Sequence, residues 1–192
     1  YDQNFTVDKP LTLSGANFGI SISTDGTDAG SKVDQVSEVG FDLSDNQRAA
    51  SQILPDFLRS GETWINGTVT IASDEVSMDG FRLHSYNGPL DFTGTDVDNF
   101  SLQNSYVTGF EGSKSFSYLD TDGVRSTGWN ISDNLIGGVA GGVGGSLNLT
   151  GVTSSTIEDN VFWRPGAAHM YLTDVDEISV KDNFFVQGLH AD

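Results

Sequence analysis

Short segments in which apolar and polar residues alternate recur along most of this chain, separated by turns rich in Gly, Asp, Asn and Ser. The clearest copies lie at residues 129–136, 156–162 and 178–185, and each contains an Asp-Asn pair followed at once by apolar residues. Alternation with a period of two indicates strands that bury one face. The pattern therefore predicts an all-β chain of short strands and tight turns.

These copies repeat at a nearly constant interval. Asn134, Asn160 and Asn183 lie 26 and 23 residues apart, and weaker copies place Phe81 and Ser105 in the same column, with intervals of 24 and 29. A further short strand precedes each copy, so one repeat holds at least three strands. Such a period is typical of solenoids, in which equivalent strands stack about 4.8 Å apart. We expect about five to six coils in a single domain, residues 1–192.

Two rows of apolar residues are expected to form the core of the stack. They are Ile71, Phe92, Leu119, Leu149 and Leu172 on the first strand of the repeat, and Met78, Leu102, Ile131, Ile157 and Val180 on the second. The asparagine after the second strand also faces inward in this alignment. Asn134, Asn160 and Asn183 are therefore predicted to form a buried ladder that hydrogen-bonds the turn amides, with a backbone that tolerates left-handed geometry.

This pattern resembles the right-handed parallel β-helix superfamily, often called pectin lyase-like, whose members show an asparagine ladder after the second sheet. The resemblance covers residues 61–192, and residues 6–17 resemble an opening coil of large bacterial surface and secreted proteins of that superfamily. It implies a right-handed coil and a secreted, periplasmic or cell-surface location in bacteria.

An insert at about residues 20–62 interrupts the repeats. Within it, helical spacing is shown by the apolar residues Ala50, Ile53, Leu54, Phe57 and Leu58, and Pro55 would end or kink the helix. We expect an irregular, partly helical insert packed against the rod. Because Tyr1 begins in the middle of a repeat, the chain is expected to be part of a longer polypeptide, with further coils or a partner at its ends.

The charge of the chain narrows the range of partners. With 27 Asp and Glu against 9 Lys and Arg, the formal net charge is −18. Such a surface repels nucleic acid and anionic membranes and attracts cations. There is no cysteine, so disulfides do not hold the fold, and no apolar run reaches the length of a membrane span.

The resemblance places a substrate groove along the first sheet, where the ionisable side chains are few. Asp91, Asn148 and Tyr171 are expected to face outward on the first strands. A polysaccharide lyase needs a base and a cation that stabilises the enolate. Candidates for the cation are Arg125, Arg164 and Lys114, and His169 is a candidate base beside Tyr171 as a sugar-stacking ring. The side chains expected to share one patch are Asp91, Asn148, Tyr171, Asp120, Asp122, Arg125, Arg164 and His169.

Calcium binding is a hypothesis for Asp120 and Asp122, which alternate before Gly123 as carboxylates do in hard-cation loops. The alternative is a solvated Asp/Gly turn. The three tryptophans, Trp64, Trp129 and Trp163, are candidates for sugar-stacking planes; Trp129 is expected in the core, and Trp163 is the best candidate for an exposed ring.

Taken together, these features favour a non-catalytic extracellular module with a structural, adhesive, glycan-binding or protein-binding role. One alternative is a calcium-assisted lyase or epimerase that acts on acidic polysaccharide. Another is a subunit of a larger assembly. Fold alone does not decide among them.

Overall fold

The computed structural model describes residues 3–19, 63–85, 88–92, 96–109, 116–119, 124–137, 147–163 and 169–186. In this part of the chain every regular element is a β-strand and every strand pair is parallel. The predicted all-β class is confirmed. The helix predicted within residues 20–62 lies outside the described residues.

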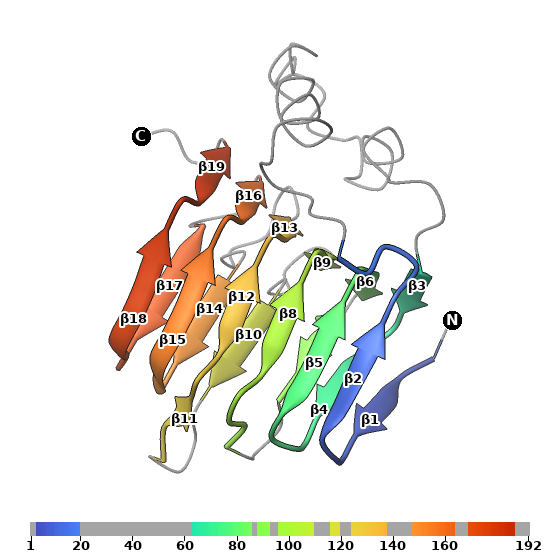
Figure 1. Cartoon of the computed structure of the whole chain (residues 1–192), viewed down its shortest axis with the longest axis horizontal. Helices are drawn as coiled ribbons and strands as arrows, with labels where there is room; N and C mark the ends of the chain where they lie inside the picture. Colours follow the sequence, from blue (N-terminus) through green and yellow to red (C-terminus); the bar gives the residue numbers. More distant parts are fainter. Residues whose placement is uncertain are drawn as a thin grey trace.

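The strands alternate among three stacks of parallel strands, which we call the first, second and third sheets (Figure 1). The first sheet consists of two groups, β1 (Phe5–Val7), β4 (Val69–Ile71) and β7 (Leu90–Asp91), then β10 (Phe116–Leu119), β14 (Leu147–Thr150) and β17 (Met170–Thr173). The second contains β2 (Leu11–Ser14), β5 (Val76–Asp79), β8 (Ser101–Gln103), β12 (Asn130–Ser132), β15 (Val152–Glu158) and β18 (Asp176–Lys181), with the short β11 (Ser126–Thr127) paired to β15. The third contains β3 (Thr63–Asn66), β6 (Phe81–Ser85), β9 (Tyr106–Gly109), β13 (Leu135–Gly137), β16 (Val161–Trp163) and β19 (Phe184–Val186).

Apart from the additional β11, each successive trio of the described strands contributes one strand to each sheet, which gives six repeats in the part of the chain that the structure describes. Figure 1 shows the second-sheet strands side by side in chain order, from β2 and β5 at one end to β15 and β18 at the other. Stacked parallel strands from consecutive repeats are compatible with a parallel β-helix.

The core lies between the sheets and follows the predicted second-strand row. The pairings align Met78 with Leu102, Leu102 with Ile131, Ile131 with Ile157, and Ile157 with Val180. A second continuous row lies on the third sheet, formed by Ile65, Leu83, Val107, Ile136, Phe162 and Phe185. Because equivalent strands of consecutive repeats pair in the same register, equivalent side chains lie on top of one another and form both rows.

One position in the predicted first-strand row is wrong. Leu119 is aligned with Thr150, and it is Tyr118 that is aligned with Leu149, which in turn is aligned with Leu172. Side chains alternate between the two faces of a strand. An assignment that is one residue off therefore exchanges the core-facing and outward-facing residues. Phe116 aligned with Leu147 fixes the register of this strand.

Trp129 belongs to the core, as expected. It is buried, and its ring lies 4.8 Å from the ring of Phe92 and 5.2 Å from that of Phe100, measured between centroids. The indole N–H donates a hydrogen bond to the backbone oxygen of Val97 at 2.6 Å. This bond satisfies the one polar atom that the buried ring carries.

The turn between the second and third sheets repeats a left-handed residue. The backbone φ angle is positive at Gly80 (79°), Asn104 (49°), Asp133 (59°), Asp159 (55°) and Asp182 (53°). We expected this geometry at the ladder asparagines, but it occurs one residue earlier. Gly, Asn and Asp adopt left-handed geometry most easily, which explains the residue before each ladder position.

Candidate functional site

The three asparagines that follow these left-handed residues form a hydrogen-bonded column. The Oδ1 atom of Asn160 accepts from the backbone N–H of Asn134, and the Oδ1 atom of Asn183 accepts from that of Asn160, each at 3.0 Å. Ser105 continues the column, because its N–H donates to Oδ1 of Asn134 at 2.9 Å. Asn134 and Asn160 are fully buried and Asn183 is half-buried. Their amides hold turns together and face the interior.

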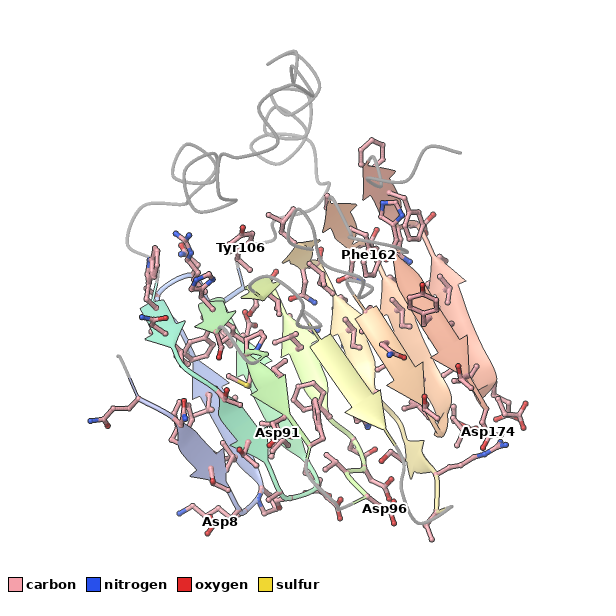
Figure 2. All side chains as sticks on the ribbon, turned by 180° about the vertical axis from the view of Figure 1, so that it is seen from behind. Asp8, Asp91, Asp96, Tyr106, Phe162 and Asp174 are labelled. Atoms are coloured by element: carbon pink, nitrogen blue, oxygen red, sulfur yellow. The ribbon has the colours of Figure 1, made fainter. Side chains whose placement is uncertain are left out.

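Arg125, a candidate cation for catalysis, is held by two carboxylates. Its guanidinium donates a hydrogen bond to Asp174 at 2.5 Å and lies 4.0 Å from a carboxylate oxygen of Asp176. Figure 2 labels Asp174 at the margin of the molecule opposite Tyr106 and Phe162. Arg125 therefore joins the turns at the margin between the first and second sheets.

His169 lies toward the other margin. It precedes β17, and its ring packs edge-on against Phe185 with 5.4 Å between centroids. Asp174, the partner of Arg125, follows the other end of β17, and five residues of extended chain span about 16 Å. His169 and the carboxylate that binds Arg125 therefore lie at opposite ends of one strand.

Tyr171 lies in β17, aligned with Asn148 of β14, as expected for outward neighbours on the first sheet. Its side chain is 42% exposed. Asp91 is aligned with Thr70 on the preceding strands of that sheet and is half-buried. These residues supply hydroxyl, amide and carboxylate groups on the first sheet.

The calcium hypothesis for Asp120 and Asp122 lies outside the described residues, as do Lys114 and Arg164. Within the described residues no group of three or more acidic or histidine side chains is arranged to hold a metal. Acidic side chains there also serve the backbone: Asp98 accepts from the N–H of Thr127 at 2.8 Å.

The third sheet carries a cluster that the sequence analysis missed. Trp64, Arg82 and Tyr106 are aligned on the neighbouring strands β3, β6 and β9. The Arg82 Cζ atom lies 3.5 Å from the centroid of the Trp64 ring and 5.2 Å from that of Tyr106. Arg82 and Tyr106 are both buried, whereas Trp64 is 41% exposed. A desolvated cation over an aromatic ring contributes about 2 kcal/mol, so Arg82 fixes an indole that stays partly exposed.

Two polar side chains lie next to this stack. His84 follows Arg82 by two residues on β6, hence on the same face, and is aligned with Asn66 of β3. Asn66 is exposed and His84 half-buried. Burial lowers the pKa of His84 below its usual value, and the positive charge of Arg82 lowers it further. His84 is therefore a neutral imidazole at pH 7, with one donor and one acceptor nitrogen.

We call Trp64, Asn66, Arg82, His84 and Tyr106 the Trp64 cluster. It offers an aromatic plane beside uncharged hydrogen-bonding groups, which suits binding of a polar ring and does not constitute a nucleophile with a base. One feature of the sequence could have indicated this cluster: the alternation Arg82-Leu83-His84 places a cation and an imidazole on one face of a strand. The alignment with Trp64 was hidden because the insert interrupts the period just before β3.

The described part of the chain contains no helix with the length and hydropathy of a membrane span. Compared with protein-family models, curated proteins and solved structures, the chain matches none of them.

Proposed function

We propose that this chain is a structural module of an extracellular protein, built as a right-handed parallel β-helix and packed end-on against another parallel β-structure. The six three-strand repeats support the β-helix. The resemblance of the sequence supports the right-handed coil, a relationship to pectin lyase-like proteins, and a secreted, periplasmic or cell-surface location in bacteria. The observation that carries the proposal is the exposure of core-row side chains in the sixth repeat.

That exposure is confined to one surface, the end face, which comprises β17, β18 and β19. Val180 continues the core row of the second sheet and Phe185 that of the third, yet they are 43% and 47% exposed. Their counterparts one repeat earlier, Ile157 and Phe162, are 1% and 0% exposed. Half-exposed side chains in a core row are what the loss of one covering layer produces.

The backbone of the end face also supports packing against another parallel β-structure. Among the described strands, β18 pairs only with β15, and β19 only with β16. The N–H of Asn160 donates to Asn183, but within the described residues no further asparagine follows to accept from the N–H of Asn183. An open strand edge recruits another strand, so the fitting partner is an extended strand of a second β-structure.

Sedimentation of the purified chain over a range of concentrations and salt tests this proposal. Copies with a net charge of −18 repel one another in dilute salt, whereas the screening length falls to about 3 Å at 1 M salt. We expect association that grows with concentration and is stronger in 1 M NaCl. Val180→Lys with Phe185→Lys is expected to weaken it at least about tenfold, since each charged group would be desolvated.

Val124→Lys is the matched control, because Val124 is equally apolar, 57% exposed and outside the end face. It adds one positive charge, against two in the double variant, away from the end face, and should leave association intact. A parent chain that stays monomeric under all these conditions, or equal loss of association in the control, would remove the support for an end-on partner.

The enzyme alternative is tested separately by incubating the chain with pectate or alginate in the presence of calcium. We expect no ultraviolet-absorbing unsaturated product, because Arg125 is engaged by Asp174 and lies a strand length from His169. Product that disappears in Arg125→Ala or Arg164→Ala would replace the structural proposal with a lyase. An epimerase would appear instead as a changed uronate composition.

A further inference from the structure

We propose that the Trp64 cluster is a binding site for a neutral glycan, in which a sugar ring stacks on the Trp64 indole and its hydroxyls bond to Asn66 and His84. This inference goes beyond the structural role above, since the Trp64 cluster lies in the first three repeats and the end face in the sixth. It is also separate from the first sheet, where the sequence resemblance placed a groove.

The position of Trp64 makes its ring a platform. β3 is the terminal strand of the third sheet among the described strands, with Arg82 of β6 over the Trp64 ring. The ring is nevertheless 41% exposed. A pyranose with equatorial hydroxyls points its C–H bonds above and below the ring and so has an apolar face. Stacking that face on the indole removes apolar surface of both partners from water.

The platform is held in place before any ligand arrives. Arg82 lies between Trp64 and Tyr106 and is buried on the sheet, so the indole rests against a packed neighbour. Figure 2 shows Tyr106 at the margin formed by the third sheet, away from Asp8, Asp96 and Asp174 at the opposite margin. A side chain fixed in advance loses little conformational entropy on binding.

The polar neighbours match hydroxyl groups. The Asn66 amide carries a donor and an acceptor, and the neutral imidazole of His84 carries one of each. A sugar hydroxyl also donates and accepts. Asn66 is exposed, half a strand from Trp64 on the same face, so a ring on the indole has both polar side chains beside it.

Charge selects a neutral glycan over an acidic one. The chain carries a net charge of −18, which repels a polyuronate or a sulfated polymer. The cation in the cluster, Arg82, is only 3% exposed, so it stabilises the platform without presenting its charge to a ligand. The remaining polar groups, Asn66 and His84, are uncharged at pH 7.

Calorimetric titration of the full chain with cellohexaose, a neutral β-1,4-linked glucose oligomer, tests the site. The titration is run in dilute salt, where charge repulsion keeps the chain from associating, and hexagalacturonate is titrated in parallel as the acidic probe. We expect cellohexaose to bind and hexagalacturonate to bind at least about tenfold more weakly. Trp64→Ala should weaken cellohexaose binding at least about tenfold, and His84→Ala about fivefold.

Tyr171→Ala is the matched control, since Tyr171 is an aromatic residue of nearly equal exposure on a different sheet. Its binding should equal that of the parent. Trp64→Phe keeps a ring beside Arg82 and should bind between the parent and Trp64→Ala, which separates loss of the platform from loss of fold. No heat with cellohexaose, equal binding by Trp64→Ala and parent, or preference for hexagalacturonate would each overturn the proposal.

Discussion

Asn160 accepts two hydrogen bonds from Asn134 through a single side-chain oxygen, one from the backbone N–H and one from the side-chain amide, both at 3.0 Å. The amide nitrogen of Asn160 in turn donates to the backbone oxygen of Ile131 at 2.8 Å and to that of Glu158 at 2.9 Å. Both asparagines are fully buried. The turn of one repeat therefore depends on a side chain from the next.

Asn160→Ala should lower the free energy of unfolding by about 1 to 3 kcal/mol, because it leaves the buried N–H of Asn134 without its acceptor. Chemical denaturation measures this loss. Asn183→Ala is the comparison: Asn183 makes the equivalent bonds to Asn160 but is only half-buried, so water can replace its oxygen at lower cost. Equal stability of parent and Asn160→Ala would show that the ladder does not support the fold.

Gly80→Ala should destabilise the chain by about 2 to 5 kcal/mol, because a left-handed backbone and a steric clash act together. The φ angle of Gly80 is 79°, and an added Cβ would lie 2.3 Å from the backbone nitrogen of Phe18. Gly19 is a matched control, with a φ of 68° and no heavy atom within 4 Å of the added carbon. Gly19→Ala should cost at most about 1 to 2 kcal/mol. A similar loss in both variants would exclude the clash as the cause.

Two substitutions of Trp129 separate its packing from its hydrogen bond. Trp129→Phe keeps a ring against Phe92 and Phe100 but loses the bond to Val97, and should cost about 1 to 3 kcal/mol. Trp129→Ala also leaves a cavity and should cost about 3 to 5 kcal/mol. Urea unfolding followed by circular dichroism gives both values. If the two variants were equally stable, the ring would contribute little to the core.

The core positions could be predicted from the sequence wherever only one alternation of apolar and polar residues fits a strand and the repeats are evenly spaced. Met78, Leu102 and Ile131 were assigned to one core row and the pairings align them. In β10, by contrast, Tyr118 and Leu119 are adjacent apolar residues, and the core row was assigned to Leu119 although the pairing aligns Tyr118 with Leu149. The spacing before Asn134 is longer than in the other repeats, so counting residues from the ladder position does not give the register of β10.

The Trp64 cluster was not predictable for a related reason. Trp64 and Arg82 are 18 residues apart, which is shorter than any interval between the ladder positions. The insert changes the chain just before β3, so sequence spacing does not indicate that Trp64 and Arg82 are neighbours. The lowered pKa of His84 is likewise a property of the folded chain, since it depends on burial and on Arg82.

The effect of the Asp159 carboxyl on the stability of the fold depends on pH. The pKa of its carboxyl is raised by desolvation first, then by the carboxylates of Asp133, Asp182 and Glu158. Because the pKa of this acid is higher in the folded state, its ionisation destabilises the fold: the favourable contribution exists below the ordinary pKa and is lost as pH rises through the raised one. Lys181 opposes the shift without reversing it.

Asp159→Asn should therefore stabilise the chain at pH 7, and the gain should disappear below about pH 4, where the parent carboxyl is protonated. Asn also accepts the φ of 55° at this position. Since Asp159 is only half-buried and solvent screens its charge, the gain is less than about 1 kcal/mol, or at most about 4 °C in melting temperature. Asp176→Asn is the control, because Asp176 accepts the N–H of Glu177 at 3.0 Å and lies near Arg125, so its removal should bring no gain. A stabilisation by Asp159→Asn that is the same at pH 3.5 and pH 7 would contradict an electrostatic origin.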